Sequence, residues 1–86
     1  MNSVSYDIAL GVVLSARRRR MGLAKADMAL ALRSTEQQVA RYEAGTNKVS
    51  VSRLFEIADI LGTEASTLVM EVEALSMPQY QLPRAQ

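Results

Sequence analysis

The chain has 86 residues, a formal net charge of +1 and 22% charged residues, and it contains neither cysteine nor histidine. This length predicts one small domain, and the missing residue types exclude disulfides, thiolate metal sites and the usual near-neutral acid–base group, so no metal or cofactor is expected. No apolar run approaches the ~20 residues of a membrane span, and no basic secretion signal opens the chain, which predicts a cytoplasmic protein without a membrane partner.

Apolar residues recur at spacings of three and four along the chain, which predicts an all-α fold of five helices. The first helix is expected over residues 6–21, with Ser5 as its N-cap and Gly22 ending it. Its inward-facing residues are expected to be Leu10, Leu14 and Met21. Val12 and Val13 fall outside that stripe and are expected on the surface.

Two short helices are expected next, over residues 24–32 and 36–44. Ala24 stands at the cap position of the first and offers no side-chain acceptor. Thr35 is expected to cap the second, and Gln38, three residues later, completes a Thr-x-x-Gln capping box. Because the link between these helices is so short, they must cross steeply, which predicts a helix-turn-helix.

The remaining helices complete a domain over residues 1–75. Ser50 is expected to cap a fourth helix that ends at Leu61, and a fifth is expected over residues 65–75. The inward-facing residues of these two helices are expected to be Leu54, Ile57, Ala58, Leu61, Leu68 and Val72. Two prolines prevent the tail, residues 76–86, from continuing as a helix, so it is expected to be flexible or to lie at a dimer interface.

The helix over residues 36–44 is the candidate recognition element. A protruding helix fits the major groove of DNA, where base edges present distinct donors and acceptors. A glutamine amide can bind adenine N6 and N7, so Gln37 is predicted to contact a base, whereas Gln38 is assigned either to a base or to capping alone. Arg41 can reach guanine or a phosphate, and Glu36 can accept from cytosine N4.

Two stretches resemble the lambda-repressor-like family of XRE/Cro/CI-type helix-turn-helix regulators: LGVVLSARRRRMGLAKADMALAL and STEQQVARYEAGTNKVSVSRLFEIADILG. YEAG stands where the family commonly has an aromatic residue or leucine followed by Glu-x-Gly. The resemblance covers about residues 10–69 and implies a compact five-helix DNA-binding domain with its helix-turn-helix core at residues 24–44. It implies that four residues face the groove: Glu36, Gln37, Gln38 and Arg41.

The resemblance also implies contacts to the DNA backbone, which orient a protein without reading sequence. Lys25 begins the second helix, and Asn47 and Lys48 lie in the loop after the third. The turn residues are further candidates: Arg33, Ser34 and Thr35. Lys25 replaces a common glutamine and should increase the attraction to phosphate. Arg33 replaces the usual turn glycine, so the backbone there must accept a left-handed conformation at some cost or turn differently.

Glu43 falls where the family often has an inward-facing acid paired with an arginine of the first helix, a position that aligns with Arg18. The resemblance thus implies a structural ion pair that holds the recognition helix on the scaffold. The four consecutive arginines at 17–20 cannot all face one ligand, because a helix turns ~100° per residue. Arg18 is therefore expected inside and Arg17 at the edge of the core, with its charged head in solvent.

The charges are distributed unevenly between the two halves of the chain. Residues 1–48 carry eight basic and four acidic side chains, whereas residues 49–86 carry two basic and five acidic ones. This asymmetry indicates either that the first half binds a polyanion or that the charges are solvated surface groups.

Taken with the resemblance, these patterns predict a sequence-specific DNA-binding transcriptional regulator, most simply a repressor, that reads an inverted repeat in double-stranded DNA as a homodimer. The candidate dimer residues are Phe55, Ile60, Val72 and Leu75. The alternatives are a monomer with a few exposed apolar residues, an antitoxin with an unknown protein partner, or an adaptor that has lost DNA binding. An enzyme is not expected, since the chain lacks histidine, cysteine and a glycine-rich phosphate loop.

Overall fold

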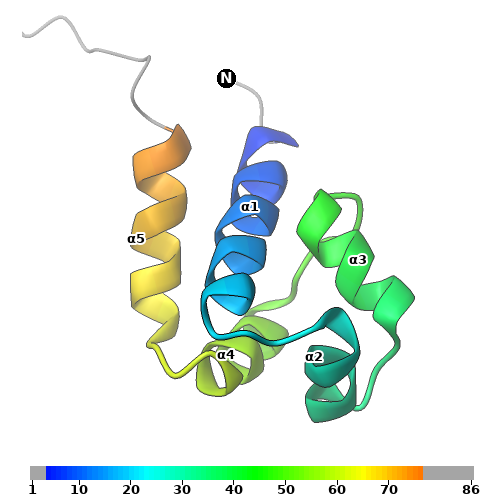
Figure 1. The fold of residues 1–86 in the computed structure, drawn as a ribbon. Helices are drawn as coiled ribbons and strands as arrows, with labels where there is room; N and C mark the ends of the chain where they lie inside the picture. The colour runs from blue at the N-terminus through cyan, green and yellow to red at the C-terminus, as the bar shows by residue number, and fades with distance from the viewer. Residues whose placement is uncertain (1–3, 77–86) are drawn as a thin grey trace, which may run out of the picture.

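The computed structural model describes residues 4–76, and within that range it consists of five α-helices and no strand (Figure 1). The predicted all-α fold is thereby confirmed. The helices are α1 (Val4–Arg20), α2 (Lys25–Leu32), α3 (Glu36–Ala44), α4 (Val51–Ile60) and α5 (Ala65–Ser76). None of them is both long enough and apolar enough to cross a membrane.

The helix ends lie close to the predicted ones, with one instructive difference at the start. α1 begins at Val4, so Ser5 lies inside the helix and is not its N-cap. The predicted caps of α3 and α4 are present: Thr35 Oγ1 accepts from the Gln38 amide and Ser50 Oγ from the Arg53 amide, both at 3.0 Å. Apart from Ser76, which ends α5, the predicted tail lies outside the described residues.

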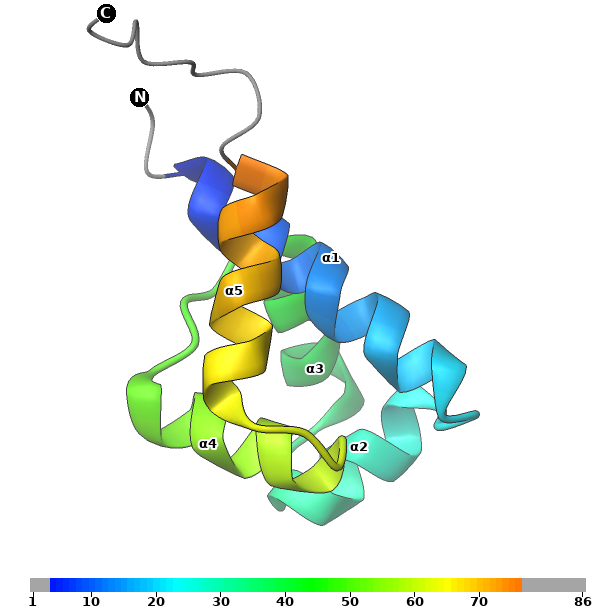
Figure 2. The ribbon, with the colours of Figure 1, turned by 90° about the vertical axis from the view of Figure 1, so that its left-hand side faces the viewer.

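The first helix is the centre of the arrangement. α1 and α5 lie side by side and run in opposite directions, so that the start of α1 and the end of α5 lie at the same end of the molecule (Figures 1 and 2). α3 packs on the side of α1 away from α5, and α4 crosses the end where α5 begins. α2 contacts both α3 and α4. α3 is therefore held by α1 and α2.

The core contains most of the apolar residues predicted for it, and two predictions for the first helix are wrong. Val13 was expected on the surface but is only 4% exposed. α1 packs against helices on two sides, so its buried face is wider than a single stripe and includes Val13 beside Leu14. Met21 was expected inside but follows the last residue of α1 and is 48% exposed.

Gly11 allows α1 and α3 to approach closely. It is buried in the middle of α1, and a Cβ at this position would lie 2.9 Å from the carbonyl oxygen of Tyr42 and closer still to that of Glu43. Those carbonyls belong to the backbone of α3 and cannot move aside independently of the helix. The missing side chain at Gly11 thus allows α3 to lie this close to α1.

Candidate nucleic-acid interface

The turn between α2 and α3 is made by a residue that rarely adopts the required conformation. Arg33 has φ 56° and ψ 45°, in the left-handed region, and its N–H donates to the carbonyl oxygens of Ala29 and Leu30. The Ser34 N–H also donates to Ala29, at 2.8 Å. These bonds satisfy the last carbonyls of α2 as a glycine would. Of the two outcomes expected for Arg33, the backbone takes the strained left-handed one.

The first turn of α3 presents polar side chains to solvent. Glu36 and Gln37 are exposed, as are Thr35 before them and Arg41 one turn later. The opposite side of α3 is anchored in the core by two buried residues: Val39 and Tyr42. Because one face of the helix is held in the core, the exposed first turn is rigidly displayed.

Gln38 contributes to the cap through its backbone and uses its side chain elsewhere. Its N–H donates to Thr35 Oγ1, which is half of the predicted capping box. Its side-chain oxygen Oε1 instead accepts from Asn47 Nδ2 at 3.3 Å. Both side chains are half-buried, in contrast to their exposed neighbours Gln37 and Lys48.

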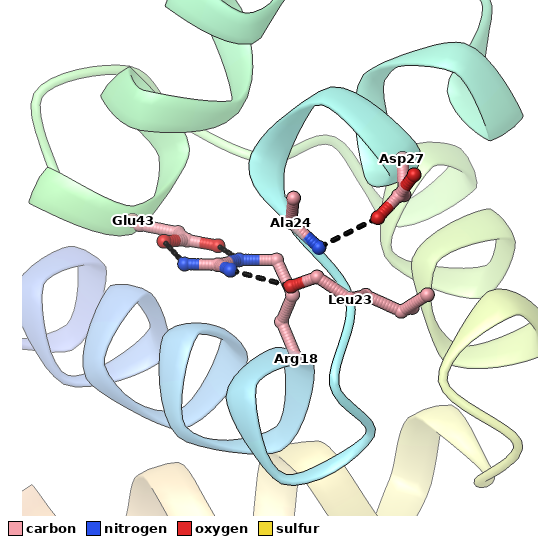
Figure 3. Close-up of polar contacts among 5 residues, drawn as sticks. All are labelled: Arg18, Leu23, Ala24, Asp27 and Glu43. Carbon is pink, nitrogen blue, oxygen red and sulfur yellow. Dashed lines mark hydrogen bonds and ion pairs between the residues drawn. The ribbon is translucent and has the colours of Figure 1, made fainter.

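Arg18 and Glu43 form a two-pronged ion pair between α1 and α3 (Figure 3). Arg18 Nε donates to Glu43 Oε2 at 2.6 Å and Nη2 to Oε1 at 3.0 Å, and Nη1 donates to the Leu23 carbonyl at 2.7 Å. Arg18 is only 6% exposed. The hydrogen bond to Glu43, and secondarily its charge, raise the pKa of Arg18 against the lowering effect of burial. The arginine thus ties α3 to α1 and to the loop before α2.

The start of α2 has an acceptor that the sequence analysis missed. The Ala24 N–H donates to Asp27 Oδ2 at 2.7 Å (Figure 3). Asp27 is the third residue of α2, the position from which an acidic side chain reaches back to the cap. The signal in the sequence is the acid three residues after Ala24. Its negative charge is also stabilised by the positive end of the helix dipole.

Arg53 is a second residue that the sequence analysis missed. Its Nη1 donates to the carbonyl oxygen of Leu32, at the end of α2, at 3.0 Å, and to Glu56 Oε1 at 2.9 Å. A cation on the last carbonyls of a helix is favourable because that end carries partial negative charge. Arg53 therefore supports the helix-turn-helix from α4, a contact that sequence spacing does not reveal.

Most of the basic residues expected near DNA are exposed around α2 and α3. Lys25, Arg33 and Arg41 are exposed and form no ion pair with any residue in the range 4–76. Lys48 Nζ lies 3.3 Å from Asp7 Oδ2, and this lysine is 86% exposed. Such an exposed pair contributes little to stability and can open readily.

The candidate dimer residues divide into two groups. Phe55 and Leu75 are 60% and 50% exposed, whereas Ile60 and Val72 pack against the core. For Ile60 this corrects the expectation of an exposed side chain, since it faces the α2 side of α4. In the described part of the chain no group of three acidic side chains is placed to hold a metal ion.

A family model described as Helix-turn-helix matches residues 14–68, most of the range that contains the five helices. The chain belongs to the lambda-repressor-like helix-turn-helix family. In this family the pair α2 and α3 is the helix-turn-helix, with α3 as its second helix.

Curated relatives of this helix-turn-helix chain include uncharacterized HTH-type transcriptional regulators from Sinorhizobium medicae and Rhizobium meliloti. Each is 38% identical over 60 residues, which cover 70% of this chain and 43% of the relative. A further relative from Sinorhizobium fredii, y4aM, is 38% identical over 62 residues. The chain thus spans less than half the length of the curated relatives it matches.

Solved structures show the same fold. The clp gene regulator ClgR from Corynebacterium glutamicum superposes with a TM-score of 0.81 at 24% identity, over 86% of this chain and 79% of that one. Apo-HppE superposes with a TM-score of 0.68 at 28% identity, over 72% of this chain but only 35% of its own length. The helix-turn-helix fold therefore also occurs within a much longer chain.

Proposed function

We propose that this protein is a sequence-specific DNA-binding transcriptional regulator that reads duplex DNA with α3. The observation that carries the proposal is the exposed first turn of α3, where Glu36 and Gln37 project from a helix held in the core on its other side. The names of the curated relatives as transcriptional regulators support it.

In the proposed complex α3 lies in the major groove. The exposed amide of Gln37 has the donor and acceptor that match adenine N6 and N7. Arg41, one turn further along α3, can donate to guanine or to a phosphate. Glu36 tolerates only a base that donates, such as cytosine through N4, and repels phosphates. α3 therefore combines side chains that attract particular bases with an acidic side chain that disfavours the others, and sequence discrimination uses both.

Contacts to the DNA backbone orient α3 in the groove. Lys25 lies at the start of α2, and exposed Arg33 and Thr35 flank the turn, with half-buried Ser34 between them. Lys48 can exchange its weak surface pair with Asp7 for a phosphate. These contacts supply sequence-independent affinity, which falls as salt rises.

We further propose that the regulator is a cytoplasmic homodimer and a repressor that blocks a promoter by occupying it. A twofold dimer places two recognition helices ~34 Å apart and so reads an inverted repeat. The exposed side chains of Phe55 and Leu75 remain the candidates for the dimer seam.

Selection of bound duplexes from a random-sequence pool at roughly physiological salt tests the proposal, since nonspecific binding is weak there. An enriched inverted repeat supports the dimeric regulator, and a single enriched half-site supports a monomeric one. Gln37→Ala should lose one base preference, whereas Ser66→Ala, exposed on α5, should keep it.

Failure to enrich any sequence, with no retention even at low salt, would contradict the proposal. A protein-interaction adaptor, which the acidic side chain of Glu36 favours, would then be the better explanation. Copurification with the product of a co-expressed neighbouring gene would instead indicate an antitoxin.

A further inference from the structure

The loop after α3 turns back beside the C-terminal end of that helix. Gly45 has φ 76°, which reverses the chain, and the N–H groups of Thr46 and Asn47 donate to the Arg41 carbonyl at 3.1 and 3.4 Å. Asn47 is therefore held beside the turn of α3 that contains Arg41 and, one turn earlier, Gln38. A residue from outside the helix is thus placed against its candidate base-reading surface.

Asn47 and Gln38 meet through their side chains. Asn47 Nδ2 donates to Gln38 Oε1 at 3.3 Å, and the Gln38 backbone is fixed at its other end by Thr35 Oγ1. An asparagine donor requires that the oxygen of the glutamine amide face it. The Nε2 group of Gln38, with its two donors, is then the end of the amide turned away from Asn47.

This contact affects how the amide can bind a base. An exposed glutamine samples several rotamers and both orientations of its amide, and it loses that freedom on binding. A half-buried glutamine held by a neighbour has already lost much of this conformational freedom before it binds. Its orientation also determines whether a donor or an acceptor is offered, which is the property that distinguishes one base edge from another.

We propose that Asn47 is a positioning residue for base reading: it turns Oε1 of Gln38 toward itself, so that Gln38 offers Nε2 donors to an acceptor on a base edge in the major groove. The acceptors available there include guanine O6 and N7 and thymine O4. The proposal rests on the proposed DNA-binding function. It gives Asn47 a role in specificity instead of the phosphate contact that the family resemblance implies.

The test measures affinities for the duplex enriched in the selection described above and for three duplexes that carry the other base pairs at one position. That position is the one whose preference disappears in Gln38→Ala. Asn47→Ala should reduce the discrimination there about fivefold or more, since a good base contact contributes at least this much. The double variant with Gln38→Ala should lose no more discrimination than Gln38→Ala alone, because the two residues act as one unit. Ser66→Ala, at an exposed position of α5, is the control and should keep the preference.

A second variant tests the orientation itself. Asn47→Asp has only acceptors, so it should draw Nε2 inward and turn Oε1 of Gln38 outward. The preference at that position should then change toward a base that donates, such as adenine through N6 or cytosine through N4. Overall affinity will fall because of the added negative charge, but the preference among bases is a ratio and is read independently of it.

The outcomes separate this proposal from the function on which it rests. An equal loss of affinity for all four base pairs in Asn47→Ala, with discrimination retained, indicates a phosphate contact and overturns the role of Asn47 alone. Unchanged discrimination in both Asn47 variants overturns it as well. Failure of the unmodified protein to prefer any sequence overturns both proposals.

Discussion

At the scale of single residues, Gly11 is a helix position where close packing against a neighbouring helix outweighs helix propensity. Replacing glycine by alanine inside a helix normally stabilises a protein by about 1 kcal/mol. At Gly11 the added methyl would collide with backbone carbonyls of α3. We therefore expect Gly11→Ala to lower the free energy of unfolding by about 1–3 kcal/mol, the usual cost of overpacking. Urea unfolding of this variant, beside Ala16→Gly at an exposed position of α1, measures the effect. Unchanged or increased stability in Gly11→Ala would contradict the close packing of α1 and α3.

Arg33 presents the reverse case, a side chain where glycine fits better. A left-handed conformation costs a residue with a Cβ roughly 1 kcal/mol, a cost that glycine avoids. We expect Arg33→Gly to raise the free energy of unfolding by about 1 kcal/mol relative to Arg33→Ala, which keeps the Cβ but also lacks the charge. Thermal unfolding of both variants gives the comparison. If the glycine variant were no more stable than the alanine variant, the turn would not be strained.

The two Arg33 variants also separate stability from DNA binding. Both lose the same positive charge, so both should bind DNA more weakly by the same factor although they differ in stability. Equal weakening in both variants would show that the charge of Arg33 contributes to DNA binding independently of the strain in the turn. Unchanged DNA affinity in both would show that Arg33 does not contact DNA.

At the scale of helices, the Arg18–Glu43 pair determines how α3 is held. Removal of one partner leaves the other charge buried and unpaired, which typically costs 3–5 kcal/mol. We expect about this loss of unfolding free energy in Glu43→Leu and in Arg18→Met, measured in urea. The double variant Arg18→Met/Glu43→Leu should be more stable than the sum of the single effects predicts. Additive losses would show that the two side chains act independently.

The contact between α1 and α5 is sensitive to pH. Arg17 Nε donates to Glu71 Oε1 at 3.2 Å, and this hydrogen bond, more than the charges of Arg17 and Arg20, lowers the pKa of Glu71 below its ordinary value of 4.5. The unfolded chain therefore binds a proton at this carboxyl before the folded one does as pH falls. The contribution of the Arg17–Glu71 contact to the free energy of unfolding is complete above pH 4.5. It is lost as pH falls through the lowered pKa of Glu71 in the folded protein.

Two variants test the pH dependence of this contact. Glu71→Gln and Arg17→Gln should each flatten the decline of unfolding free energy between about pH 5 and pH 3. Glu71→Gln removes the titrating group itself, whereas Arg17→Gln removes the largest cause of its lowered pKa and leaves the charge of Arg20. Urea unfolding at a series of pH values measures how the free energy of unfolding changes with pH in each variant. A decline as steep as that of the unmodified protein would show that the α1–α5 pair does not contribute.

The sequence predicts the helices of this protein well because their ends depend on local chemistry. Thr35 and Ser50 are caps that accept from backbone three residues ahead, and the predicted range 36–44 is the observed α3. Burial depends also on neighbouring helices, and there prediction is less complete. Val13 is buried because α1 has partners on two sides. Arg53 reaches the end of α2 from a different helix, which no spacing within the chain reveals.

In the candidate site, too, local features are predictable from the sequence and contacts with other segments are not. The exposure of Gln37 follows from its place in the first turn of α3, so a pattern suffices to propose it as a base contact. Gln38 has two competing roles in the sequence, and neither includes Asn47. Its side-chain partner depends on the path of the loop after Gly45, which is determined by a left-handed turn and by hydrogen bonds to the Arg41 carbonyl.

At the scale of the whole molecule, the arrangement of helices separates the charges that the sequence divides into halves. Lys25, Arg33 and Arg41 are exposed on α2, α3 and the turn between them, whereas the acidic residues of the second half lie on α4, α5 and their connection. The one basic residue of the second half within the described range, Arg53, forms an ion pair with Glu56. In the described range, the exposed basic residues without an ion pair thus lie on the helix-turn-helix and, as Arg19 and Arg20, at the end of α1. A positive surface of this kind favours the approach of a polyanion.

This separation predicts how binding depends on salt. Each cationic side chain that neutralises a phosphate contributes about 0.9 to the slope of log affinity against log salt concentration, because counterions are released. Lys25→Gln should therefore reduce the steepness of that slope by about 0.9 and weaken binding to all sequences alike. Gln37→Ala should leave the slope unchanged and lose one base preference. Fluorescence anisotropy titrations at several salt concentrations, on the selected operator and on a scrambled duplex, measure both quantities. If Lys25→Gln kept the full slope, the positive surface around α2 would not contact the DNA backbone, and orientation of α3 in the groove would depend on the turn and on the loop after α3 instead.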